Sequence, residues 1–232
     1  MLHLVFTKTF HYQILKKMSK SEETNIHKAT ELIIRISLVI AYCDRKFHDS
    51  ESKIIKQWIK QRIEEKYSNQ DKKREIKNTY DNIFKESIQL ANNDQLRINQ
   101  LCKELRQLES QRSQIAAMDL AVQIMTADNI IHHNEIFLIH KISNLLGISH
   151  DEVMEITNSE ILKMGKVPEK IDIERLLSID PTVSNKKANK WFEKLDDTWH
   201  GATTSTRSGV KRKIAEKMYD EVSKAWERYP VS

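Results

Sequence analysis

Two pairs of acidic residues recur in the same arrangement, and they are the side chains of this sequence best suited to chemistry. Asp44 is followed by Glu51, and Asp128 is followed at the same distance by Glu135. In each copy a short polar turn lies between two helical patterns, so the later carboxylate can fold back beside the earlier one. If the two copies meet, four carboxylates gather, and calcium and magnesium prefer such oxygen ligands. The pattern predicts a divalent cation site, with zinc as a further option because histidines lie in the same turns.

The same carboxylates have a structural interpretation, which stays open beside the metal site. Each glutamate follows a histidine, His48 or His132, by three positions, where a capping-box residue reaches back to free backbone amides. An aspartate in a tight turn commonly accepts a hydrogen bond from its own backbone. Capping alone accounts for both acidic positions in each copy, and it requires no ion.

Other catalytic patterns are missing from the sequence. It contains no glycine-rich phosphate loop, no Gly-x-Ser-x-Gly elbow and no His-Glu-x-x-His motif. Its two cysteines, Cys43 and Cys102, are far apart and predict neither a disulfide framework nor a zinc knuckle. We therefore expect a protein that is not an enzyme. A basic group can contact phosphates as an alternative function, although no aromatic platform flanks it: Arg207, Lys211, Arg212 and Lys213.

The composition favours a helical protein that works in a reducing compartment. The chain has 232 residues, 39% of them hydrophobic and 31% charged, with 4 glycines and 3 prolines. So few helix-breaking residues indicate an all-α fold. The net charge of +5 permits acidic partners, nucleic acid among them, without requiring them. We expect neither a membrane span nor a signal peptide, and a cytoplasmic location.

Apolar periodicity places the elements that must position these residues. Helices are expected over 23–43, 50–65, 83–91, 94–108, 110–127, 134–146 and 215–229, with a short helix after Ser149, one over 171–178 and one capped by Ser184. Gly147 is expected to end the helix before it in a left-handed conformation. Residues 66–80 are interpreted as a loop or an exposed helix, 1–22 as an N-terminal arm and 158–170 as a linker.

An internal repeat supports this division. The segment SLVIAYCDRKFHDSESKII (37–55) aligns with AVQIMTADNIIHHNEIFLI (121–139). The repeated turn resembles the Ala-Asp-Gly-containing turn of the TerB (tellurite-resistance) family, over about residues 24–157. This resemblance implies an all-helical domain found in stress-response and defence settings. The family's glycine is replaced by Arg45 in one copy and Asn129 in the other, so we expect the first turn to differ in shape.

Residues 177–202 (LSIDPTVSNKKANKWFEKLDDTWHGA) carry a second resemblance. An Asp180-Pro181 turn, a serine cap and a basic helix are similar to the opening half of a DnaJ-type J-domain, and the similarity extends over 171–229. It implies that a basic face and the loop histidine bind a DnaK-type chaperone: Lys186, Lys187, Lys190, Lys194 and His200. The family's His-Asp-Pro is replaced by His200-Gly201-Ala202 in the expected loop, which implies that ATPase stimulation is lost.

These observations predict an all-α protein with a TerB-like domain (23–157) and a degenerate J-like domain (171–232). The preferred function is a non-enzymatic adaptor of a bacterial stress-response or defence system, phage defence included. Its protein partner would be a neighbouring-gene product or a DnaK-type chaperone. The alternatives are a co-chaperone like DjlA, which also joins a TerB-like region to a J-domain, and a metal-binding tellurite- or stress-resistance protein.

Overall fold

The computed structural model describes residues 20–108, 111–169, 171–179, 182–206 and 209–229. Within these ranges the chain forms helices and no strand, so the predicted all-α class is confirmed. The expected arm lies outside the described residues, apart from its last three positions, which belong to α1. The helices are α1 (Lys20–Ala41), α2 (Asp49–Lys66), α3 (Gln70–Asn92), α4 (Ile98–Gln107), α5 (Gln111–Met125), α6 (His133–Leu146), α7 (His150–Lys163), α8 (Ile173–Leu176), α9 (Asn185–Ser205) and α10 (Val210–Trp226).

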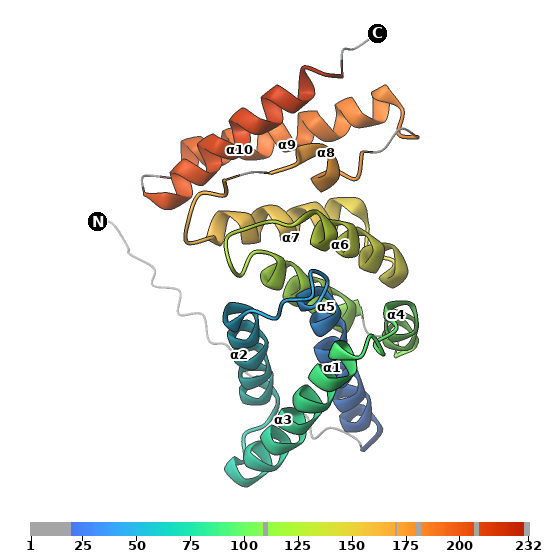
Figure 1. The fold of residues 1–232 in the computed structure, drawn as a ribbon. Coiled ribbons are helices and arrows are strands. Elements are labelled where there is room, and N and C mark those ends of the chain that lie inside the picture. The colour runs from blue at the N-terminus through green and yellow to red at the C-terminus, as the bar shows by residue number, and fades with distance from the viewer. Residues whose placement is uncertain (1–19, 109–110, 170, 180–181, 207–208, 230–232) are drawn as a thin grey trace, which may run out of the picture.

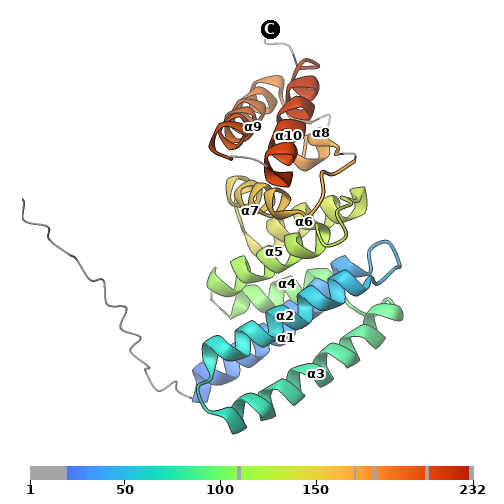
Figure 2. The same ribbon diagram turned by 90° about the vertical axis from the view of Figure 1, so that its left-hand side faces the viewer.

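The helices stack into an elongated molecule (Figures 1 and 2). Helices α2 and α3 lie at one end, α8–α10 lie at the other, and α5–α7 lie between them. Helix α1 packs against α3, α4 and α5. Its Ile33, Ile34 and Ile36 are all fully buried, although they point in different directions around the helix. Surrounding helices therefore cover α1 on nearly every side, and each such side chain contributes roughly 1.5–3 kcal/mol by leaving water.

Three expected boundaries between helices were wrong. Residues 66–80, interpreted as a loop or an exposed helix, mostly belong to α3, which has 23 residues. Ile76, Tyr80 and Phe84 are buried at four-residue spacing, but the charged residues between them mask this periodicity. The helix expected from residue 94 starts only at Ile98, because Asp94 adopts a φ of 53° in the turn before it. The linker also starts later than expected, since α7 continues to Lys163.

The expected J-like elements also differ from the structure. The helix expected over 171–178 is reduced to the four residues of α8. The predicted Ser184 cap is confirmed, since its hydroxyl accepts the Lys187 N–H at 3.4 Å. The loop expected at His200-Gly201-Ala202 does not form, because α9 runs through it to Ser205. No proline follows His200 to break the helix, and Gly201 lowers helix propensity without ending it. The Asp180-Pro181 turn lies outside the described residues.

The C-terminal helices are fixed to the rest of the chain by specific contacts. Helix α10 packs on both α9 and α7, and α8 packs on α6. A His140 ring nitrogen, Nε2, lies 3.1 Å and 3.0 Å from the carbonyl oxygens of Arg175 and Leu176. The Lys166 N–H donates to Asn129 Oδ1 at 3.1 Å, so the segment after α7 is tied to the second acidic turn. No helix in the described part of the chain is long and apolar enough to cross a membrane.

Candidate functional site

The two acidic turns have the same backbone conformation. Arg45 and Asn129 both adopt a φ of 66°, so the expectation that the first turn would differ is wrong. Asp44 Oδ1 accepts the Lys46 N–H at 2.8 Å, and Asp128 Oδ1 accepts the Ile130 N–H at 2.9 Å. These aspartate–backbone bonds hold the turn in both copies and impose the left-handed conformation on whatever residue follows. Arginine accepts this conformation at a cost of roughly 1 kcal/mol.

The glutamates occupy the start of the helix that follows each turn. Glu51 Oε2 accepts the His48 N–H at 2.6 Å, and Glu135 Oε2 accepts the His132 N–H at 3.0 Å. The predicted capping contacts are therefore present in both copies. Both glutamates are only 5% exposed. They are thus buried acids whose described hydrogen bonds come from the backbone.

The four carboxylates interact electrostatically across the repeat. Burial is the main cause that raises the pKa of Glu51 to about 7, and Asp44 and Asp128 raise it further. Burial likewise raises the pKa of Glu135 to about 8, and the same aspartates and Glu51 add to it. The capping N–H groups oppose both shifts without cancelling them. The two turns therefore lie close together, which was the condition for the four carboxylates to gather, and their combined negative charge favours uptake of a proton or a cation.

The side chains do not form a ready-made metal site. Among the described residues, no three histidine, cysteine, aspartate or glutamate side chains are grouped to hold one metal ion. One oxygen of each glutamate already accepts the N–H of its N-cap histidine. The Nδ1 atom of His133 lies 3.7 Å from a carboxylate oxygen outside this group, Asp172 Oδ2. Cation binding at Asp44, Glu51, Asp128 and Glu135 thus stays a prediction. The nearby Cys43 is protonated at neutral pH, because burial and these acids raise its pKa to about 12.

The basic face of α9 is partly engaged within the chain. Lys194 Nζ lies 3.0 Å from Asp151 Oδ1 of α7, and Lys187 Nζ lies 4.7 Å from the centre of the Trp191 ring. Lys186 and Lys190 are exposed. All four predicted partner-binding lysines are therefore exposed, and two of them also contact other side chains of this chain. The other predicted member, His200, is exposed and its ring packs beside that of Tyr219 at 5.5 Å.

The basic group near the start of α10 is less uniform than the sequence indicated. Lys211 and Lys213 are exposed. Arg212 Nε lies 2.9 Å from Glu216 Oε1, so its charge is partly balanced. Arg207 lies outside the described residues. Phosphate contact by this group stays a prediction.

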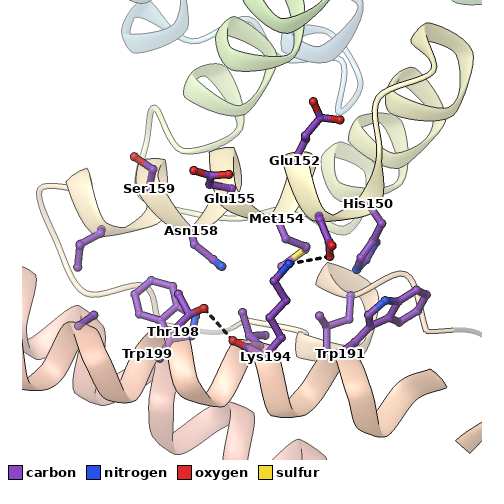
Figure 3. Close-up of a pocket in the computed structure, with 15 residues that line it drawn as sticks. His150, Glu152, Met154, Glu155, Asn158, Ser159, Trp191, Lys194, Thr198 and Trp199 are labelled. Atoms are coloured by element: carbon purple, nitrogen blue, oxygen red, sulfur yellow. Dashed lines mark hydrogen bonds and ion pairs between the residues drawn. The ribbon is translucent and has the colours of Figure 1, made fainter. Parts of the chain in front are cut away.

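A cavity of about 500 Å³ lies between α7 and α9 (Figure 3), and we name it the α7–α9 groove. Because α10 packs on both helices, α7 and α9 are held apart and space is left between them. Met154 and Leu162 line it from α7, and Leu195 and Trp199 line it from α9. Apolar lining with a few polar groups is typical of ligand-binding sites.

Three polar atoms in the lining of this groove are buried without a hydrogen-bond partner. They are His150 Nε2, Asn158 Oδ1 and Trp199 Nε1. Trp199 is only 1% exposed, so water does not readily satisfy its N–H. Leaving such an atom unpaired costs about 1–3 kcal/mol. The residues that line the groove therefore hold unsatisfied donors and acceptors just behind its apolar surface.

The entrance of the groove combines an aromatic stack with charges. The His150 ring stacks on Trp191 at 4.2 Å between centroids. Burial is the main cause that lowers the pKa of His150 to about 4, and the nearby His140 ring lowers it further. This imidazole is therefore neutral near pH 7. The Lys194–Asp151 ion pair bridges the two helices beside it (Figure 3).

Sequence reasoning missed this groove. Trp199 is a buried side chain, while Trp191 is half-buried at the entrance. Trp191 and Trp199 lie on one face of α9, which was a usable signal. Nothing in the local pattern showed that α7 would form the opposite wall.

The fold and the turns define an all-helical protein built around a duplicated helix–acidic turn–helix unit. The family described as Tellurite resistance protein TerB matches residues 33–158, and the chain belongs to this family. The match includes both acidic turns and most of α7, and it ends before α8–α10. Comparison with curated proteins and with solved structures gave no significant match. The TerB resemblance is thereby confirmed, whereas no comparison supports the J-domain resemblance.

Proposed function

We propose that this protein is a non-enzymatic adaptor of a stress-response or defence system, and that its α7–α9 groove holds a segment of a protein partner. Membership of the TerB family supports the tellurite- and stress-resistance setting. The observation that carries the adaptor role is the groove itself, with Trp199 Nε1 and Asn158 Oδ1 buried and unpaired.

The chemistry of the groove fits a peptide. Trp199 Nε1 donates a hydrogen bond and Asn158 Oδ1 accepts one, so the C=O and N–H of a peptide backbone satisfy both. Met154, Leu162 and Leu195 then pack against the apolar side chains of the segment. In Figure 3 the Asn158 side chain points from α7 toward α9. A small ion satisfies the polar atoms but leaves the apolar surface uncovered.

The histidine at the groove and the two cysteines, which lie outside it, support binding rather than catalysis. With a pKa of about 4, His150 is a weak general base at neutral pH. Burial raises the pKa of Cys102, like that of Cys43, to about 12, so neither is a nucleophilic thiolate. In this proposal the C-terminal helices do not stimulate a DnaK-type ATPase, because His200-Gly201-Ala202 lies inside α9 and lacks the family's aspartate.

A substitution that removes one hydrogen-bond donor tests the proposal. The full chain is used to select binders from a peptide library, and the affinity is then measured with Trp199→Phe, which keeps an aromatic ring but lacks the N–H. Trp226→Phe is the matched control, because Trp226 Nε1 donates to Asn189 Oδ1 at 2.6 Å. We expect Trp199→Phe to weaken binding about tenfold and Trp226→Phe to leave it unchanged. Equal affinities for both variants contradict a peptide site in this groove.

The paired acidic turns support a second candidate function, a cation-binding resistance protein. Glu51 and Glu135 are buried with raised pKa values, and a divalent cation relieves their repulsion. Calcium, magnesium or zinc is then expected to raise the melting temperature, and Asp128→Ala with Glu135→Ala is expected to abolish the shift. No shift with any of these ions removes this candidate.

A further inference from the structure

A second groove lies at the opposite end of the molecule, between α2 and α3, and we name it the α2–α3 groove. Its volume is about 820 Å³. Ile59, Ile63 and Phe84 are almost fully buried in its floor, and the half-buried Ile88 extends this apolar strip. Figures 1 and 2 show α2 and α3 side by side at the end of the stack away from α8–α10. The groove is therefore separate from the site proposed above.

Cationic side chains surround this apolar floor. The lining has two carboxylates, Glu64 and Asp81, and six cations: Lys56, Lys60, Lys73, Arg74, Lys77 and Lys85. Lys73 pairs with Glu64, and Lys77 Nζ lies 2.8 Å from Asp81 Oδ2. These two pairs use both carboxylates of the lining.

The remaining cations of the lining form no ion pair within the described part of the chain. Lys60, Arg74 and Lys85 are exposed and have no carboxylate partner among the described residues. Lys56 Nζ lies over the Phe84 ring at 5.6 Å, which places a fourth positive charge above the floor. The groove thus combines an apolar base with a rim of uncompensated positive charge.

We infer that the α2–α3 groove binds an acidic amphipathic helix of a partner protein. Apolar side chains on one face of such a helix cover the isoleucines, and flanking aspartates and glutamates meet the cations of the rim. The walls have 18 and 23 residues, which correspond to lengths of roughly 27 and 34 Å. A partner helix of about 15 residues, roughly 22 Å long, fits along them.

Other occupants match the groove less well. Single-stranded nucleic acid needs aromatic faces for stacking, and Phe84 is only 5% exposed beneath Lys56. A membrane surface needs protruding apolar side chains, and the exposed large ones in the described chain, such as Phe137, lie elsewhere. Residues 1–19 carry three lysines and no acid, so charge disfavours them as an internal occupant.

A designed helix tests the inference on the full chain. The probe is a labelled helical peptide with leucines at i, i+3, i+4 and i+7 and glutamates on the flanks. Its two controls are a scrambled peptide of the same composition and a helix with serines in place of the leucines. Binding is measured by fluorescence anisotropy at low and high salt. We expect the designed helix to bind more tightly than either control, and more weakly at high salt.

Charge-reversal variants then locate the site. Lys60→Glu with Lys85→Glu is expected to weaken binding at least tenfold, because both side chains are exposed on the rim and the changes do not disturb the core. Lys211→Glu with Lys213→Glu makes the same charge change outside the groove and is expected to leave the affinity within about twofold. Trp199→Phe is expected to have no effect, so this result is independent of the α7–α9 groove.

Four results overturn the inference. The first is no binding of the designed helix at about 0.1 mM. The second is equal binding of the scrambled or serine-containing peptide, which indicates charge attraction alone. The third is equal weakening by both charge-reversal pairs. The fourth is displacement of the helix by duplex DNA or anionic vesicles at lower concentration than by unlabelled helix.

Discussion

The acidic turns make a quantitative prediction about Glu135→Gln. Glutamine keeps an oxygen that accepts the His132 N–H, so the capping contact at the start of α6 survives the substitution. What the variant loses is the negative charge, which is buried beside Asp44, Glu51 and Asp128. Comparing wild type with Glu135→Gln therefore separates the cost of burying this negative charge from the role of the side chain in capping.

The sign and size of the effect follow from the pKa. Glu135 titrates at about 8 in the folded chain and at 4.5 ordinarily, so the folded state binds the proton more tightly. The contribution of Glu135 to the free energy of unfolding is then fully present below pH 4.5, and it is lost as the pH rises through about 8. Each tenfold change in proton affinity is worth about 1.4 kcal/mol, which gives an upper bound near 5 kcal/mol. Relaxation of the neighbouring acids reduces this, and we expect Glu135→Gln to gain about 2–3 kcal/mol near pH 8.5.

Urea unfolding in the presence of EDTA measures this difference. Near pH 4 the two chains should agree within about 0.5 kcal/mol, since Glu135 is then largely protonated in both the folded and the unfolded wild type. Glu152→Gln is the control of opposite sign, because Ser149 hydrogen bonds lower the pKa of this exposed capping glutamate and its charge is favourable. A Glu135→Gln chain that is no more stable than wild type near pH 8.5 refutes the cost assigned to burying this charge beside the other acids.

Two other changes have expected outcomes. The pKa of His150 is lowered to about 4. Its contribution to the free energy of unfolding is therefore fully present above pH 6.5 and is lost as the pH falls through 4. His150→Phe should keep the stack on Trp191 and reduce the loss of stability in acid, as acid titration followed by circular dichroism can show; an unchanged acid midpoint contradicts this. Gly147→Ala should cost about 1 kcal/mol in urea unfolding, because Gly147 has a φ of 75° at the end of α6. A change below about 0.3 kcal/mol contradicts this conformational requirement.

How far the sequence predicted the molecule depended on how local each interaction is. The capping contacts of Glu51 and Glu135 follow from spacing within one turn, so they were predictable from the residues alone. The repeat allowed the two turns to meet but did not require it. Their shared conformation was not expected, because the aspartate–backbone bonds outweigh the preference of Arg45.

The parts that were missed depend on packing between distant segments. Helix α3 was divided because its buried positions, such as Ile76 and Tyr80, lie among many charged residues. The α7–α9 groove requires α10 to hold two helices apart, and no local pattern specifies this. The loop expected at His200 depended on a family resemblance, and the local sequence lacks the proline that the family has there.

The duplicated turns are alike in conformation but differ in what they hold. Asn129 Oδ1 accepts the Lys166 N–H at 3.1 Å and so anchors the segment that leads to α8, whereas Arg45 occupies the equivalent position in the first turn. Both positions favour glycine by φ, but only Asn129 makes an anchoring hydrogen bond. The same substitution therefore has different expected results at the two positions. Arg45→Gly should stabilise the chain by roughly 0.5–1 kcal/mol, because it relieves the left-handed strain.

Asn129→Gly removes the anchor as well as the small strain of an asparagine. We expect faster hydrogen exchange at Lys166 and in the residues up to α8, while exchange in α1 and α5 stays unchanged. Equal exchange in the two variants contradicts the anchoring role. Asn129 thus adds one hydrogen bond to the contacts of His140 with the carbonyl groups of α8, and together they hold the segment after α7 and the start of the C-terminal helices against the TerB domain.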